Sequence, residues 1–91
     1  MAPYNPPLGE AYAHVDVSGY DKRMILCLIG KGGKGFYDIT RKLNLSYIWW
    51  DRQRNVIELW GNYNVYATSK MINILENFSR KFVPTTLEIA D

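Results

Sequence analysis

The sequence predicts an α+β domain in which three helices pack on one face of a three-stranded antiparallel sheet. Residues 10–18 alternate between apolar and polar side chains, and residues 45–50 and 56–60 are rich in β-branched and aromatic residues, which favours three strands. In three other segments apolar residues recur every three or four positions, which favours amphipathic helices. Because 91 residues leave room for one core, these apolar faces must all meet in a single domain.

Three prolines among residues 1–9 predict an extended N-terminal tail ahead of the domain, which we expect to span residues 10–82. The first strand turns His14, the only histidine, to its polar face. A single histidine with no cysteine or second histidine beside it predicts no metal site. The apolar face of the strand carries Ala13, Val15 and Val17.

The first helix is expected to open at a capping box, with Ser18 as the cap and Asp21 three residues on, and to end near Ile29. Its apolar spacing defines two faces. One face turns Ile25 and Leu28 toward the core, and the other carries Lys22, Leu26 and Ile29.

A second helix is expected over residues 34–43. A third should follow Gly61 and run over residues 65–82, since Pro84 prevents it from going much further. Residues 83–91 are then a C-terminal tail. The apolar stripes are Phe36, Ile39 and Leu43 in the second helix, and Val65, Thr68, Met71, Ile72, Leu75, Phe78 and Phe82 in the third.

A polar turn over residues 51–55 joins the second and third strands into a hairpin. The alternation predicts that Leu45, Tyr47 and Trp49 face the helices together with Ile57 and Leu59. An apolar outer face would mark contact with a protein partner or a second copy, or a shelf for the proline-rich tail. A shift of one residue would instead bury Trp50 and expose Trp49. The outer face so predicted carries Ile48, Trp50, Val56 and Trp60, and the expected interface residues are Ile48, Trp50 and Trp60.

Charge is unevenly distributed along the chain, although the formal net charge is only +2. Residues 22–54 hold eight basic residues against two aspartates, which gives +6, so the rest of the chain is net acidic. This segregation is typical of a protein that binds a polyanion, and a solvated basic face without a partner has the same pattern. The basic residues are Lys22, Arg23, Lys31, Lys34, Arg41, Lys42, Arg52 and Arg54.

The segment Gly30-Lys31-Gly32-Gly33 joins the first two helices and predicts a phosphate site. Glycines let a sugar-phosphate backbone approach the main chain, because no Cβ atom stands between the two. The amides at the start of the second helix favour an anion, and Lys31 and Lys34 add positive charge.

With this order of elements, the residues resemble the K homology (KH) family of type I, whose signature is an Ile-Gly-x-x-Gly segment followed by apolar residues at fixed offsets. The resemblance covers about residues 10–82. It implies a type I KH fold, β-α-α-β-β-α, that holds about four nucleotides of single-stranded RNA or DNA with their bases in a narrow groove. The matching residues are Ile29 to Gly33, Phe36, Ile39, Leu59, Gly61, Val65, Thr68 and Ile72.

The resemblance also implies which residues line the groove. The first helix and the outer edge of the second strand form its walls, the glycine loop holds the phosphates, and two arginines lie near its mouth. The family often has a small residue where Leu26 stands, so this groove should be narrower. The nucleic-acid-binding residues expected are Lys22, Leu26, Ile29, Gly30, Lys31, Gly32, Gly33, Lys34, Arg52 and Arg54.

Several other classes are excluded or disfavoured. Gly30, Gly32 and Gly35 fit a dinucleotide-binding fingerprint, but the expected preceding helix and the short chain exclude that fold, and Phe36 excludes a P-loop. No set of nucleophile, base and orienting group is visible, so we expect no enzyme and no cofactor. The main alternative is a KH-fold module that binds a protein or dimerises.

The expected location is inside the cell, in the cytoplasm or nucleus, without membrane contact. The longest apolar stretch, residues 24–29, is far shorter than the roughly 20 residues of a spanning helix, and no signal peptide is visible. Cys27 is the only cysteine and cannot form an internal disulfide, which suits a reducing compartment.

Overall fold

The computed structural model describes residues 4–62 and 65–82, and its elements follow the predicted order. Three antiparallel strands and three α-helices confirm the predicted α+β class. A short 3₁₀ turn, η1 (Lys31–Gly33), joins the first two helices. The predicted C-terminal tail, residues 83–91, lies outside the described residues. The strands are β1 (Ala13–Asp16), β2 (Tyr47–Asp51) and β3 (Val56–Trp60), and the helices are α1 (Lys22–Ile29), α2 (Lys34–Lys42) and α3 (Val65–Lys81).

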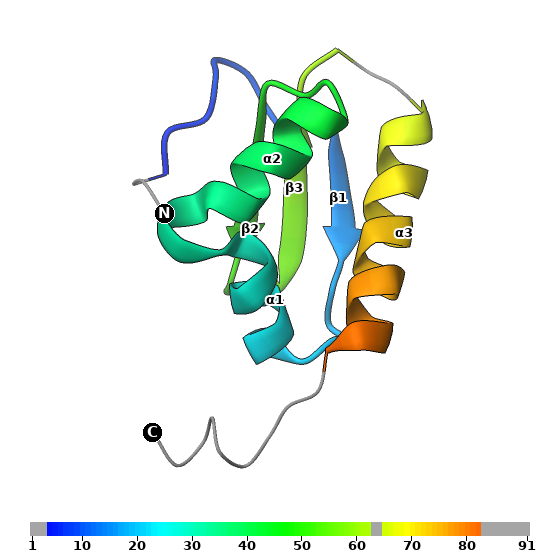
Figure 1. Ribbon diagram of the computed structural model, residues 1–91. Coiled ribbons are helices and arrows are strands. Elements are labelled where there is room, and N and C mark those ends of the chain that lie inside the picture. The colour runs from blue at the N-terminus through cyan, green and yellow to red at the C-terminus, as the bar shows by residue number, and fades with distance from the viewer. Residues whose placement is uncertain (1–3, 63–64, 83–91) are drawn as a thin grey trace.

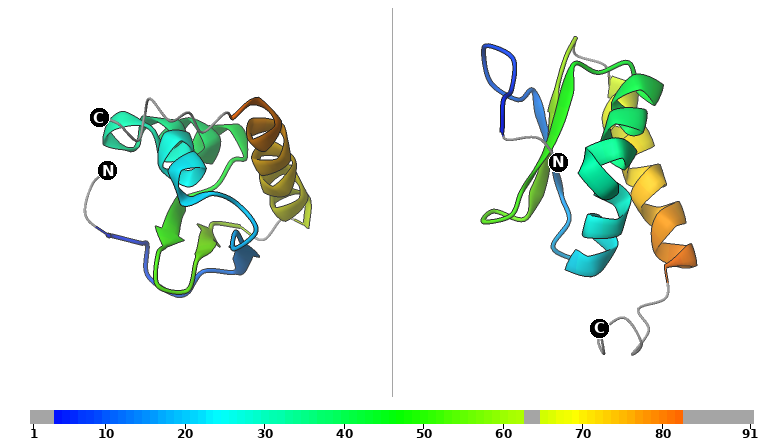
Figure 2. Two further views of the ribbon diagram at one scale, coloured as in Figure 1. Left: turned by 90° about the horizontal axis from the view of Figure 1, so that it is seen from below. Right: turned by 60° about the vertical axis from the view of Figure 1, so that its left-hand side comes forward.

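The fold has two layers, a sheet and the helices that cover one of its faces (Figure 1). β3 lies between β1 and β2 and runs antiparallel to both, so β2 is an edge strand. α2 packs on β2, and α3 packs on β1. The N-terminal segment passes over the sheet face that is opposite to the helices (Figure 2).

The core fills the space between the two layers. β1 and α2 confirm their predicted apolar faces. In α3 the predicted stripe is only partly right, because Met71 and Leu75 are buried together with Ala67, whereas Val65 and Ile72 are exposed. The core cluster comprises Val15, Val17, Met24, Ile25, Leu28, Ile29, Phe36, Ile39, Leu43, Ile48, Trp50, Ile57, Leu59, Met71 and Leu75.

Asp21, rather than the predicted Ser18, caps α1. Asp21 has an extended backbone, and its side chain accepts a hydrogen bond from the Arg23 N–H at 2.8 Å. Ser18 instead belongs to the turn after β1, where its N–H donates to Asp16 Oδ1 at 2.9 Å. Both residues are good caps, and the turn after β1 delays the helix until Asp21.

The cap at Asp21 makes the stability of the fold depend on pH. Hydrogen bonds from the side chain and backbone N–H of Arg23 lower the pKa of Asp21 below its ordinary value of 3.8. A carboxyl group whose pKa is lowered by folding adds stability above its unfolded pKa, and this stability is lost as the pH falls through the folded pKa. We expect Asp21→Ala to lower the free energy of unfolding at neutral pH and to lose less stability in acid than the wild type. Urea unfolding at several pH values tests this, and parallel pH curves for the two proteins would contradict it.

The predicted facing of β2 is wrong. Ile48 and Trp50 are buried against the helices, with 3% and 4% of their surface exposed, whereas Tyr47 and Trp49 lie on the outer face. The prediction extended the alternation back to Leu45. Leu45 packs against the core, but it belongs to the link from α2, where its N–H donates to a carbonyl in the last turn of that helix. In β2 the alternation of inward-facing and outward-facing side chains, its phase, is therefore opposite to the predicted one.

β3 has its predicted facing, so the error is confined to β2. Ile57 pairs with Trp50, and Leu59 pairs with Ile48, on the face that meets the helices. The arrangement is the one-residue shift that the sequence left open. Of the three expected interface residues, only Trp60 lies on the outer face, and it is 4% exposed.

The close crossing of α1 and α2 depends on Gly35. A Cβ atom at this position would lie 2.0 Å from the carbonyl oxygen of Leu28 and 2.9 Å from that of Ile29. Both are backbone atoms, so the two helices would have to separate to admit a side chain. Packing alone therefore explains Gly35, without a nucleotide-binding role.

We expect Gly35→Ala to destabilise the fold by about 2 to 3 kcal/mol, the upper part of the range of roughly 1 to 3 kcal/mol for an overpacked core. Gly19→Ala is the matched control, because Gly19 has no positive φ and its Cβ would meet no atom of the described chain within 4 Å. The control should change the free energy of unfolding by less than about 0.5 kcal/mol. Urea unfolding followed by circular dichroism measures both, and equal losses would show that the helix crossing tolerates a side chain.

Candidate nucleic-acid interface

A pocket opens at the C-terminal end of α1, between this helix and the edge strand β2. Its volume is about 310 Å³. α1 and the first residue of the glycine loop form one side, and β2 with the turn after it forms the other. The lining residues are Leu26, Ile29, Gly30, Trp49, Trp50 and Arg52. Two parts of the chain separated by the whole of α2 therefore meet at one apolar site.

Leu26 forms the open apolar wall of the pocket. Its side chain is 50% exposed, whereas its neighbour Ile25 is fully buried and Ile29 is 8% exposed. Removing apolar surface from water is favourable by roughly 25 cal/mol per Å². A ligand that covers Leu26 therefore gains hydrophobic free energy that the free protein does not have.

The opposite wall is held in place by contacts of Trp50. The indole Nε1–H of this buried side chain donates to Asn55 Oδ1 at 3.1 Å, which satisfies its polar group and fixes the ring. The Arg52 guanidinium lies 5.2 Å from the centre of the same ring, at a cation–π distance. Arg52 is thereby positioned on the lining of the pocket. Within residues 4–62 and 65–82 it makes no ion pair with an acid.

The glycine loop closes one end of the pocket. Gly30, Gly32 and Gly33 have φ angles of 78°, 66° and 83°, which residues with side chains rarely adopt. A Cβ at Gly30 would approach the Gly35 nitrogen to 3.0 Å, whereas at Gly32 it would meet no described atom within 4 Å. Gly32 is exposed, so its main chain is open to a ligand.

Positive charge at the loop comes from Lys31 and Lys34. Both side chains are exposed, and neither forms an ion pair with any residue that the structure describes. Three arginines of the basic segment are instead paired with acids. These pairs are Arg23 with Asp21 at 2.7 Å, Arg41 with Asp38, and Arg54 with Asp51 and Glu58 at 3.9 and 3.7 Å.

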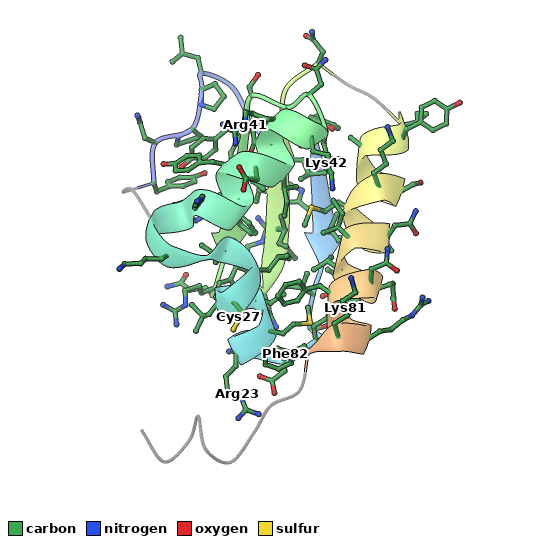
Figure 3. The ribbon with its side chains drawn as sticks, viewed as in Figure 1. Arg23, Cys27, Arg41, Lys42, Lys81 and Phe82 are labelled. Atoms are coloured by element: carbon green, nitrogen blue, oxygen red, sulfur yellow. The ribbon has the colours of Figure 1, made fainter. Side chains whose placement is uncertain are left out.

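Arg41 and Lys42 lie at the C-terminal end of α2, which is the end remote from the glycine loop (Figure 3). Cations in the last turn of a helix are favoured by its dipole whether or not a ligand is bound. This part of the basic segment therefore has a structural explanation. The positive charge that is available to a ligand at the pocket reduces to Lys31, Lys34 and Arg52.

The structure brings only some of the predicted site residues together. Leu26, Ile29, Gly30 and Arg52 line the pocket, and the rest of the loop continues from Gly30. Two predicted residues are not part of the lining. Lys22 begins α1, at the end remote from the loop, and Arg54 lies on the outer side of the sheet against Glu58.

Sequence reasoning missed Trp49 and Trp50 as pocket residues. The wrong phase of β2 placed Trp49 in the core and Trp50 on the outer face. The signal that could have found them is the shifted register, which buries Trp50 and leaves Trp49 at the edge of the sheet.

Aromatic residues gather on the outer face of the sheet, in a group that we call the outer aromatic cluster: Tyr4, Tyr47, Trp49 and Trp60. The ring centre of Tyr4 lies 4.7 Å from Trp49, 6.0 Å from Trp60 and 6.3 Å from Tyr47. The N–H of Asn5 donates to the Tyr47 hydroxyl at 2.9 Å. The face thus serves as a shelf for the N-terminal segment, which was one of the three expectations for an apolar outer face.

A polar contact anchors Tyr4 next to this cluster. Its hydroxyl donates to Glu58 Oε1 at 3.4 Å, and Glu58 is only 8% exposed. Glu58 Oε2 lies 3.7 Å from both His14 Nε2 and Arg54 Nη1. Desolvation and the Glu58 carboxylate raise the pKa of Tyr4 above its ordinary value of 10.0.

Comparison of the chain with family models, with curated proteins and with solved structures gave no match in any of the three. Among the described residues, no helix combines the length and apolar character needed to cross a bilayer. The same residues contain no group of three or more His, Cys, Asp or Glu side chains placed to hold a metal ion.

Proposed function

We propose that the chain binds single-stranded RNA or DNA as a KH domain of type I, holding about four nucleotides. One observation carries the proposal. The bare main chain at Gly32 lies beside Lys31 and Lys34, at one end of an apolar pocket. A nucleotide needs positive charge and close approach for its phosphate and an apolar slot for its base, and here the lysines of the loop and the apolar pocket are adjacent.

The order of the elements supports the family assignment. The resemblance implies the order β-α-α-β-β-α with the Ile-Gly-x-x-Gly segment between the first two helices, and this chain has the same arrangement. The two apolar signature positions after the loop, Phe36 and Ile39, are buried in the core. Two other signature positions, Val65 and Ile72, are exposed on α3 and do not line the pocket, so support for the assignment comes from the first half of the motif.

Each pocket residue has a distinct role in this proposal. Lys31 and Lys34 bind the phosphates through their charge, and the bare main chain at Gly32 lets the strand approach. The N–H groups of Gly33 and Lys34 already donate to the carbonyl oxygens of Gly30 and Lys31. Leu26 and Ile29 cover one face of a base. Arg52 reaches a phosphate or stacks on a base, since its planar guanidinium serves both contacts.

An unpaired strand fits this site better than a duplex. The pocket volume of about 310 Å³ is at the lower end of the range of roughly 300 to 1,000 Å³ for small-ligand sites. Its apolar walls can hold only a base that has left its stack, and single strands expose such bases without breaking pairs.

The glycine loop is tested by a double variant, Lys31→Asp with Gly32→Asp. Wild-type binding of labelled RNA should weaken with salt with a log–log slope of about −1.5 to −3, since roughly two to four phosphates contribute about −0.7 each. The double variant should bind at least about tenfold more weakly and show a flatter slope, because it repels the phosphates. Fluorescence anisotropy at several salt concentrations measures both quantities.

The matched control is Lys70→Asp with Asn77→Asp on α3. Each double variant changes the net charge by −3, from −2 for the lysine and −1 for the neutral residue. The control positions are exposed and belong to α3, which lies across the helical layer from the loop between α1 and α2 (Figure 1). Circular dichroism checks that both variants fold. Equal loss of affinity in the two would mean that net charge, and not the loop, governs binding.

A second candidate function is contact with a protein partner or a second copy through the outer face. The outer aromatic cluster favours it, because Tyr47 and Trp49 remain partly exposed there. Tyr4 covers part of the face and contributes to the burial of Trp60.

We expect the wild type to be monomeric in light scattering, because Tyr4 covers the cluster. Tyr4→Ala should raise the apparent mass at high protein concentration, since it uncovers apolar surface. Tyr66→Ala, an exposed tyrosine on α3, is the control. A wild-type dimer that persists in Tyr4→Ala would place the contact on another surface.

A further inference from the structure

Trp49 belongs both to the pocket and to the outer aromatic cluster. It lines the pocket together with Leu26 and Arg52, and its ring lies 4.7 Å from that of Tyr4. It is also parallel to Tyr47, with ring centres 6.4 Å apart and planes inclined by 7°. Because β2 is an edge strand, Trp49 stands where the pocket meets the outer face. A ligand that leaves the pocket on this side meets an aromatic surface.

The aromatic surface is accessible and already in place. Tyr4 is 50% exposed, and Trp49 and Tyr47 are partly exposed. Hydrogen bonds from Tyr4 to Glu58 and from Asn5 to Tyr47 hold the N-terminal segment on the sheet. A ligand therefore loses little affinity to the ordering of these rings, because the free protein has already ordered them.

We propose that Trp49 and Tyr4 form a stacking platform for a base that lies beyond the roughly four nucleotides of the pocket. The bound strand would then be longer by one or two nucleotides and would turn around the edge of β2. The platform depends on the proposed function, because the strand must first occupy the pocket. Aromatic stacking accepts any base and adds roughly 5- to 150-fold in affinity per base.

The charges beside the platform favour a nucleic-acid strand over a proline-rich peptide. Arg52 lines the pocket next to Trp49 and pairs with no acid in the described part of the chain, so it can meet a phosphate between the two bases. Glu58 is the acid that contacts Tyr4, and it is 8% exposed and lies 3.7 Å from Arg54. Asp51 also acts on Tyr4 and lies 3.9 Å from Arg54. The exposed Glu10 lines a second pocket with Tyr4, which Trp49 does not line, so its charge opposes a strand only on that side of Tyr4.

The platform is tested by the length dependence of binding. Wild-type protein is titrated with an RNA of four nucleotides and with RNAs that carry two further nucleotides at the 5′ or the 3′ end. We expect one of the two extensions to raise the affinity by roughly 5-fold or more. An extension that carries two abasic residues keeps the phosphates and should lose this gain.

Tyr4→Ala separates the platform from the pocket, because Tyr4 does not line the pocket. The variant should bind the four-nucleotide RNA as the wild type does and should lose most of the gain from the extension. Tyr66→Ala is the matched control and should keep the gain. A longer RNA can also occupy the pocket in more registers, which raises its apparent affinity. This statistical gain is the same for the wild type, Tyr4→Ala and Tyr66→Ala, so it does not affect their comparison. Titrations are made at concentrations where light scattering shows a single species.

A direct readout is photo-cross-linking with 5-iodouracil placed in the extension. Peptide mapping should find the cross-link at Trp49 or Tyr4. The inference is overturned if the extension adds nothing, if Tyr4→Ala keeps the gain, or if the cross-link maps elsewhere. In each of these cases the proposed function still stands if the wild type binds the four-nucleotide RNA and the Lys31→Asp, Gly32→Asp variant does not. If the wild type does not bind the four-nucleotide RNA, both the proposed function and the stacking platform are overturned. If it binds a proline-rich peptide tightly instead of RNA, the ligand of this surface is a protein.

Discussion

The close packing of α1 against α2 is the constraint on which the rest of the structure depends. Gly35 leaves room for the carbonyl oxygen of Leu28, so the two helices nearly touch. The chain between them must then reverse within a few residues, which requires positive φ at Gly30, Gly32 and Gly33. The same reversal leaves the main chain at Gly32 bare at the end of the pocket. Helix packing and the proposed phosphate site therefore use the same glycines, and the geometry of the proposed site follows from the way in which the core is closed.

The distribution of charge between paired and available groups reconciles the proposed binding of a polyanion with a net charge of only +2. Screening limits exposed charges to a range of about 8 Å at physiological salt, so only cations close to the pocket matter to its ligand. Arg23, Arg41 and Arg54 each face an acid, and Lys42 lies at the far end of α2. What remains near the pocket is a small local group, which suits modest affinity for a short strand.

Regular patterns made most of the fold predictable, and irregular links did not. β1 and α2 were predicted correctly because each has an uninterrupted apolar period within a single element. The cap of α1 was misplaced because Ser18 and Asp21 are both good caps, and only the turn after β1 decides between them. β2 was given the wrong phase because Leu45 is apolar and packs on the core, yet precedes the strand.

The candidate site was predictable where it depends on local sequence. Gly30 and Ile29 belong to a short motif, and Leu26 lies one turn before it on the same helix. Trp49 depends on the phase of a strand elsewhere in the chain. Tyr4 contacts residues more than 40 positions away, and such a contact leaves no periodic signal in the sequence.

The phase of β2 settles what both faces of the sheet can do. Trp50 fills the core beneath the pocket and carries Arg52 on its ring, while its neighbour Trp49 turns outward to Tyr4. Had the strand taken the opposite phase, Trp49 would lie in the core, and Trp50 would have turned outward in its place. An edge strand has no neighbour on its outer side, so a large side chain there is reached from both faces of the sheet. The position of Trp49 on this edge is what makes the pocket and the outer face one continuous surface rather than two separate ones.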